Sequence, residues 1–390
     1  MLELPSFKGR AGWEFTELGD FTLDAWEPAP ANGTAFEASH LLEPPAGSVE
    51  LVQVDAASTD GSSADGVLVL PLGVARERHP ELVEPHLGTI VRDVDAFTAS
   101  NDAAWEGGAF VHVPRGVVVD APILLTAVTA TPGTILNRRV LIVLEEEAEA
   151  EVWEQYVSGS DEATVFNTVV ELRVGQNAKL RYVCGQELNE RSWIFGSQRA
   201  EVARDGALDW VALGFGSAKG KVRMETLLAG PGADAKVTGA YAPHARQHVD
   251  FDTTQEHGAP NTTSDLAFRG ILADRSSAVW RGMIKVDPGA QQTDAFQVCR
   301  NLLLSKRAHA DAIPGLEILA NDVRCTHAAA VAQVDKEQLF YLQSRGLDHA
   351  SSMRLVIEGF MAELVERFEE GPMREALGAA LEQRLHTLLD

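Results

Sequence analysis

The chain has 390 residues, of which 45% are hydrophobic and 23% charged, as in ordinary globular proteins. Its formal net charge of -24 argues against binding to nucleic acid or to an anionic membrane, because those partners attract basic patches. The N-terminus has no basic start followed by an apolar core, no run approaches the roughly 18 apolar residues of a membrane helix, and three cysteines are too few for a disulfide framework. These features predict a cytoplasmic protein with reduced thiols.

Residues 1–107 are predicted to form a small mixed α/β region. Strand-like runs at 51–55 and 66–73 flank a turn-rich segment. Apolar residues then recur at helical spacing between 87 and 97, which indicates one or two short helices that close this region.

Residues 108–340 have a different character. Runs of about 4–8 β-favouring residues follow one another, each bounded by Gly, Asp, Asn or Pro, and helical spacing is absent. A turn containing alanine recurs about every 30 residues, at Ala148, Ala178 and Ala207. Repeats of this length without helices between them indicate the stacked coils of a β-solenoid. An antiparallel β-sandwich is the alternative that the pattern alone leaves open.

Residues 341–390 are predicted to form a helical subdomain. Apolar residues fall at helical spacing in two stretches separated by EEGP at 369–372, as in a helical hairpin. The stripe formed by Val356, Phe360 and Leu364 is wider than so small an appendage needs for its own core. We therefore expect this stripe to dock a partner.

The most specific wording lies in residues 291–347. The segments RNLLLS (300–305), LEILANDVRCTH (316–327) and EQLFYLQSRGL (337–347) together resemble the SufB/SufD family, the scaffold proteins of the SUF iron–sulfur cluster assembly system. The wording is closest to the SufD branch. The resemblance covers about residues 108–368 and is strongest after 245, whereas the N-terminal region matches little in the family.

The resemblance implies a right-handed parallel β-helix core, which decides between solenoid and sandwich. It also implies a non-catalytic scaffold subunit that pairs with SufB through the β-helices. The C-terminal helices would bind the SufC ATPase, with Val356, Phe360 and Leu364 as the docking residues. ATP hydrolysis is expected in SufC, since this chain has no GxxxxGK[ST] phosphate loop.

No cofactor is expected to be held tightly by this chain alone. Iron or a nascent iron–sulfur cluster would be shared with SufB. The resemblance leaves open whether a flavin binds and whether the isolated chain forms a homodimer.

Cys325 and His327 are the first candidates for the cluster assembly site. They are two residues apart on a predicted strand, so both side chains face the same way. Thiolate and imidazole are ligands that suit iron–sulfur chemistry. The resemblance places His327 on the family histidine near the SufB contact, which is implicated in nascent cluster formation. Cys325 is more consistent with a structural role.

Cys299 departs from the SufD pattern. SufD-like sequences commonly have Asn before RNLLLS, whereas SufB proteins have there the cysteine thought to accept sulfur or to hold the cluster. The Glu that follows the histidine in SufB is replaced by Ala328. Two interpretations stand: a structural thiol, or a SufB-like or homodimeric cluster scaffold that uses Cys299. Alternation places Cys299 with Gln297 and Asn301 on the more polar strand face, which predicts moderate reactivity.

His248 and His257 lie in a segment that also contains Asp250 and Asp252. Their spacing fits no standard zinc signature, and the segment is strand-like. We expect both histidines to satisfy backbone groups at solenoid corners or to line the SufB contact. Asp250 and Asp252 are the only pair that favours the remote alternative, a β-helix carbohydrate-active enzyme. Cys184 is predicted to lie in the core.

Overall fold

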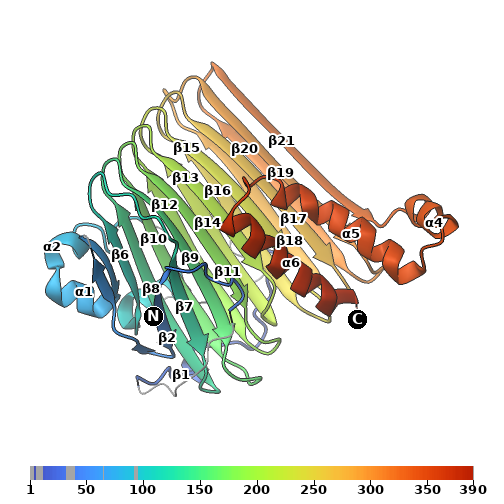
Figure 1. Cartoon of the computed structure of the whole chain (residues 1–390), viewed down its shortest axis with the longest axis horizontal. Helices are drawn as coiled ribbons and strands as arrows, with labels where there is room; N and C mark the ends of the chain where they lie inside the picture. Colours follow the sequence, from blue (N-terminus) through green and yellow to red (C-terminus); the bar gives the residue numbers. More distant parts are fainter. Residues whose placement is uncertain (1–3, 6–11, 32–39, 65, 92–94, 390) are drawn as a thin grey trace.

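The computed structural model describes residues 4–5, 12–31, 40–64, 66–91 and 95–389. These residues form a parallel β-solenoid with a mixed N-terminal region at one end and helices over one face (Figure 1). All strand pairs between β6 and β21 are parallel, so the solenoid prediction is confirmed and the antiparallel sandwich is excluded.

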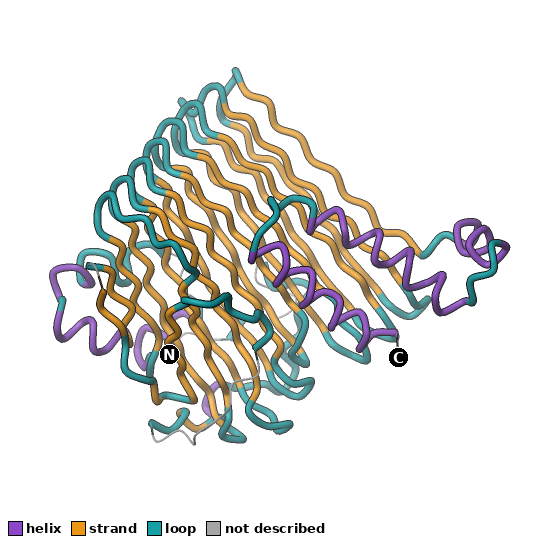
Figure 2. The backbone as a smooth tube through the Cα atoms, viewed as in Figure 1, coloured by secondary structure: helices purple, strands orange, loops and turns teal. Residues whose placement is uncertain are grey.

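Two sheets make up the solenoid, and the chain alternates between them. The first contains the even-numbered strands β6 (Gly108–Val113), β8 (Thr134–Leu144), β10 (Val165–Val174), β12 (Trp193–Val202), β14 (Lys219–Leu228), β16 (His248–His257), β18 (Ser277–Val286) and β20 (His309–Ile318). The second contains the odd-numbered strands β7 (Ile123–Thr129), β9 (Glu149–Ser158), β11 (Lys179–Glu187), β13 (Ala207–Gly214), β15 (Asp234–Tyr241), β17 (Thr263–Leu272), β19 (Thr293–Leu303) and β21 (Val323–Gln333). One even and one odd strand make one coil (Figure 2).

The alanine repeat marks the corners of the coils. Ala148, Ala178 and Ala233 each precede the first residue of an odd strand and are at most 1% exposed. Ala207, the third alanine of the predicted repeat, lies one residue later, as the first residue of β13 and the register partner of Lys179. Only a small side chain fits inside so tight a turn between closely stacked coils.

The burial pattern of each strand depends on whether another part of the chain covers the outer face of its sheet. All eleven residues of β8 are buried, because the solenoid core lies on one side of it and the N-terminal region on the other. Strand β16 instead alternates between buried and half-buried residues along most of its length. Strands from β8 onward have 8 to 11 residues, which is longer than the runs of about 4–8 residues predicted from the sequence.

The N-terminal region caps the first coil and covers the outer face of the even sheet. Its elements are a 3-10 helix (Leu23–Ala25), β1 (Glu27–Pro28), β2 (Val49–Val54), β3 (Ala57–Ser58), β4 (Ser62–Ala64), β5 (Val67–Pro71), α1 (Leu72–Arg78), α2 (Pro80–Val83) and α3 (Ala96–Ala104). Trp13 stacks on Phe97 of α3, which stacks on Phe195 of β12 with ring centroids 3.8 Å apart. This aromatic stack fixes the N-terminal segment on the solenoid.

Three helices end the chain: α4 (Lys336–Ser344), α5 (His349–Val365) and α6 (Pro372–Leu389). Helices α5 and α6 lie across the outer face of the odd sheet, whereas α4 projects away from it (Figure 1). Among the helices of the described residues, none is long and apolar enough to cross a membrane.

The last coil of the solenoid has no cap among the residues that the structure describes. Strands β20 and β21 are the last strands of their sheets, and within the described residues nothing pairs with their outer edges. We call residues 309–333 the open coil. Most of β21 is exposed, whereas β19 in the preceding coil is largely buried or half-buried. Unpaired strand edges of this kind are natural templates for pairing with another chain.

Candidate functional site

The open coil carries Cys325 and His327, which the strand register places on one side of β21. Cys325 pairs with Ala295 of β19, and His327 pairs with Gln297. Ala295 and Gln297 are buried in the solenoid interior, so both candidate ligands point toward the mouth of the interior. This confirms that the two side chains share a face.

His327 is exposed, because no further coil covers it. Cys325 is half-buried and packs against the apolar cluster of Ile284, Val286 and Ala295. Burial and the nearby carboxylate of Asp294 raise the pKa of the Cys325 thiol. The structure therefore offers His327 as an accessible imidazole and Cys325 as a mainly protonated thiol at neutral pH.

Cys299 lies in the coil before the open coil and is fully buried. Its Sγ lies 3.6 Å from Tyr241 Oη and 3.5 Å from Asn301 Nδ2. Burial raises the pKa of this thiol to about 12 despite these hydrogen bonds. Only a thiolate attacks a persulfide or binds iron, so Cys299 is inert in this conformation.

The burial of Cys299 corrects the expectation of moderate reactivity. Gln297, Cys299 and Asn301 do share a strand face, but that face is the solenoid interior. The opposite face packs beneath α5, where Leu302 joins the cluster of helix and sheet residues. The interior accepts polar side chains because they bond to each other and to backbone: Gln297 Nε2, for example, donates to the carbonyls of Gly282 and Gly315.

The described residues contain no group of three or more His, Cys, Asp or Glu side chains that could hold a metal ion. Cys325 and His327 are two candidate ligands at an open edge. A site built on them needs ligands from elsewhere to reach a full coordination set. Cys184 lies in the solenoid core, 8% exposed, as predicted.

His257 lies inside the solenoid, and His248 is half-buried. His257 is fully buried, and its two ring nitrogens lie 2.8 Å from Thr262 Oγ1 and 2.9 Å from Ser264 Oγ. Burial lowers its pKa to about 4, so the ring is neutral. It bonds to side-chain hydroxyls at a solenoid corner and not to the backbone groups that were expected, and its full burial leaves it no surface for a SufB contact.

His248 lies beneath the chain's own N-terminal segment. Its Nε2 is 3.0 Å from Thr16 Oγ1, and its Nδ1 is 2.8 Å from Ser277 Oγ. Burial lowers its pKa. The neighbouring Asp250 accepts a hydrogen bond from Lys221 Nζ at 2.9 Å and is 2% exposed. A carbohydrate-active enzyme needs carboxylates in an open groove, so this arrangement counts against that alternative.

The C-terminal stripe packs partly on the solenoid. Leu364 is 1% exposed and belongs to a cluster with the odd sheet. Phe360 packs against the same cluster, and the Arg269 guanidinium lies 4.7 Å from the centroid of its ring. Val356 is half-buried. The sheet beneath α5 explains much of the width of the stripe, so this width is no evidence for a partner, and SufC docking at Val356, Phe360 and Leu364 stays a prediction.

Exposed apolar side chains lie instead on α4 and around it. Phe340 is 73% exposed and Tyr341 56%, and Leu355 at the start of α5 is 49% exposed. The sequence analysis missed this surface. Phe340 and Tyr341 have no apolar residues three or four positions away with which to form a buried stripe. This pattern could have predicted their exposure from the sequence.

Comparisons with known proteins bear on this arrangement. The SufBD core domain of the SUF system of FeS cluster assembly matches residues 127–360, and the SufBD protein N-terminal region matches residues 52–125. The second match extends the similarity into the region where sequence motifs indicated little.

Individual proteins of this family are also similar to the chain in sequence. The iron–sulfur cluster assembly protein SufD of Bacillus subtilis (strain 168) is 31% identical over 325 residues, which cover 82% of this chain and 74% of that protein. An iron–sulfur cluster assembly SufBD family protein of Mycobacterium tuberculosis is 30% identical over 77% of each chain. The SufB protein of B. subtilis is 27% identical over 80% of this chain and 67% of its own length.

Proposed function

Because this chain belongs to the SufB/SufD family of iron–sulfur cluster assembly proteins, we propose that it is a SufD-type scaffold subunit of the SUF system. In this role it holds partner proteins and a nascent cluster in the cytoplasm and catalyses no reaction itself. Its partners are SufB and the SufC ATPase, and the cluster is cargo shared with SufB.

The open coil is the observation that carries the proposal. Leu316 and Ile318 on β20 and Val331 on β21 are 38%, 40% and 43% exposed, although their register partners in the preceding coil are buried. A SufB strand pair stacked on this edge would complete the backbone hydrogen bonds and cover these side chains. It would also bring SufB ligands next to Cys325 and His327.

Ile318→Lys tests pairing at the open coil. A charged side chain on an edge strand opposes strand addition, so SufB should be lost from the complex when both chains are co-expressed and purified. Val118→Lys is the matched control, since Val118 is 58% exposed outside the regular strands of the first coil. It should leave SufB binding intact. SufB retained by Ile318→Lys would contradict the proposed interface.

The same experiment addresses a homodimer. If the isolated chain is a dimer that Ile318→Lys converts to a monomer, then the open coil pairs with a second copy when SufB is absent. The alternative of a cluster scaffold that uses Cys299 is disfavoured, because that thiol is buried and protonated.

SufC is proposed to bind at the exposed apolar side chains of α4, Phe340 and Tyr341. The stripe of α5, which packs partly on the odd sheet, stays the alternative docking site. The double variant Phe340→Ala/Tyr341→Ala should lose SufC while keeping SufB, because these side chains support little of the chain's own packing. Removal of α5 and α6 is a poorer test, since it would uncover the outer face of the odd sheet. SufC binding unchanged in the double variant would overturn this assignment.

A further inference from the structure

A row of arginines follows one corner of the solenoid. The strands β12, β14, β16, β18 and β20 are in register at Trp193, Lys219, His248, Ser277 and His309. Two residues before this position, the last three coils carry Arg246, Arg275 and Arg307. Stacked strands are about 4.8 Å apart, so the three arginines rise along the corner at that spacing.

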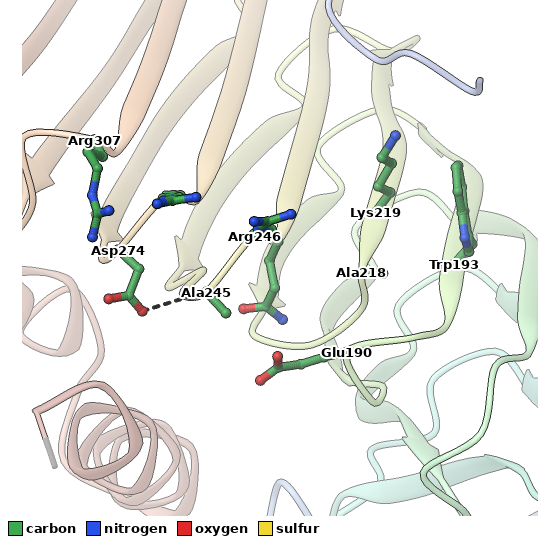
Figure 3. A pocket seen from close by; sticks show the side chains of 10 residues that line it. Glu190, Trp193, Ala218, Lys219, Ala245, Arg246, Asp274 and Arg307 are labelled. Atoms are coloured by element: carbon green, nitrogen blue, oxygen red, sulfur yellow. Dashed lines mark hydrogen bonds between the residues drawn. The ribbon is translucent and has the colours of Figure 1, made fainter.

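These arginines line a cavity of about 580 Å³. Lys219 and Trp193, at the register position of the two earlier coils, also line the cavity, and Figure 3 shows them with Arg246 and Arg307. The volume lies within the range of small-molecule sites, which run from about 300 to 1,000 Å³. The site is thus a hollow with a cationic wall.

The three arginines have no carboxylate partner within the part of the chain that the structure describes. This is notable in a chain with 57 acidic and 33 basic residues. Two carboxylates also line the cavity, and among the described residues neither forms an ion pair with the three arginines. Glu190 lies 2.6 Å from His244 Nε2, and Asp274 accepts a hydrogen bond of 3.0 Å from the Ala245 N–H.

A further cation lies behind the cavity wall. Arg384 of α6 donates to Gln247, a lining residue, and to the carbonyl of Ala242 at 2.7 Å. Burial lowers its pKa only to about 10, so it stays charged at neutral pH. Like charges held close together repel one another. An anion in the cavity would relieve this repulsion.

We propose that this corner binds a small anion with two or three consecutive phosphate groups, held by Arg246, Arg275 and Arg307. Guanidinium groups bind phosphate oxygens in a two-pronged geometry, and arginines on successive coils present such forks along a line. A linear polyphosphate can meet several of them at once, whereas orthophosphate meets fewer. The site does not depend on the proposed scaffold function.

Calorimetric titration of the full-length chain tests the site, with inorganic orthophosphate, pyrophosphate and tripolyphosphate as probes. We expect affinity to rise in that order and to fall with ionic strength. Arg246→Ser/Arg275→Ser should weaken pyrophosphate binding about tenfold or more, as expected for the loss of two charge-assisted contacts. Serine is the residue of the adjacent coil at this position, Ser217.

Arg115→Ser is the control, because Arg115 is a 65% exposed arginine that forms an ion pair with Glu146 outside the cavity. It removes one positive charge from the surface and should leave the affinity unchanged. ADP compared with pyrophosphate identifies the source of the phosphates: equal affinities indicate a site for the phosphates alone, and tighter ADP binding indicates a nucleotide. No saturable binding of tripolyphosphate, or equal affinities in the two serine variants, would overturn the proposal.

Discussion

Cys299 and Cys325 lie on neighbouring strands, yet they differ in accessibility. Cys299 is enclosed by the solenoid interior, and Cys325 lies at its open mouth. The difference comes from one coil of the solenoid: the open coil covers Cys299, and no described part of the chain covers the open coil. Position along the solenoid axis therefore controls thiol chemistry in this chain.

The rates of alkylation of the cysteines should follow this difference in accessibility. At about pH 8, iodoacetamide should modify Cys325 in the folded chain and leave Cys299 and Cys184 unmodified, because alkylation needs an accessible thiolate. Both buried cysteines should react once urea unfolds the chain. Peptide mass spectrometry measures the three rates, and modification of Cys299 in the folded chain as fast as Cys325 would contradict its burial.

His327 is expected to affect the cargo and not the fold. Its side chain is exposed at the open mouth, so His327→Ala should change the melting temperature by no more than a few degrees. Iron and sulfide in the anaerobically purified complex with SufB and SufC should decrease. His309→Ala is the control, since His309 is a 70% exposed histidine of the same coil. Equal iron and sulfide contents in the two variants would show that His327 takes no part in cluster assembly.

His257 makes folding stability depend on pH. Its pKa is about 4 when folded and close to the ordinary histidine value of about 6.5 when unfolded, so acid protonates the unfolded chain first. Its contribution is present above about pH 6.5 and is lost as pH falls toward 4. Between about pH 7 and pH 5 the loss should be about 2 kcal/mol. Urea unfolding measures it, and His257→Gln should lack this part of the pH dependence; an unchanged slope would show that the histidine does not carry it.

At the scale of elements, α5 and α6 act as an integral layer of the solenoid. Beyond apolar packing, Arg367 of the α5–α6 connection donates to Thr238 Oγ1 at 3.0 Å and to Asp265, in the odd sheet. Lys236 lies 4.9 Å from the centroid of the Phe368 ring. These contacts fix the helices on the sheet, so the outer face of the odd strands can be apolar.

Alanine substitutions of two leucines of α5 should distinguish its buried face from its exposed face by their effect on stability. Leu364→Ala should lower the free energy of unfolding by about 2–4 kcal/mol, because it leaves a cavity against the sheet. Leu355→Ala, at a position that is 49% exposed, should cost less than about 1 kcal/mol. Denaturant unfolding measures both, and similar losses would show that α5 does not pack as described.

At the scale of the whole molecule, the solenoid is protected at one end only. The N-terminal region covers the first coil, and the open coil is stabilised from one side. In a stacked repeat structure each coil depends on its neighbours, so a terminal coil without a cap opens most easily.

Hydrogen exchange should show this asymmetry. In the isolated chain, amides of β20 and β21 should exchange faster than those of β12 or β13, which have neighbours on both sides. Addition of SufB should slow exchange in β20 and β21 in particular. Protection of both strands in the monomeric chain, equal to that of the central strands, would contradict an open coil.

Much of this architecture could be predicted from the sequence. Short β runs with a repeat of about 30 residues indicated a solenoid, and period-two alternation correctly grouped Gln297 with Cys299 and Cys325 with His327. These features are local, because strand alternation and tight corners depend on neighbouring residues. The wording of residues 291–347 was enough to indicate the family.

Only the tertiary structure decided which face of each strand is the interior. Alternation groups side chains but does not say which group is covered, and here the polar group with Cys299 points inward while an apolar group lies under α5. In the same way, the stripe with Leu364 covers the odd sheet, and Phe340 on α4 is left exposed. Burial depends on contacts between residues far apart in the chain, and burial sets both the pKa of a thiol and the availability of a surface.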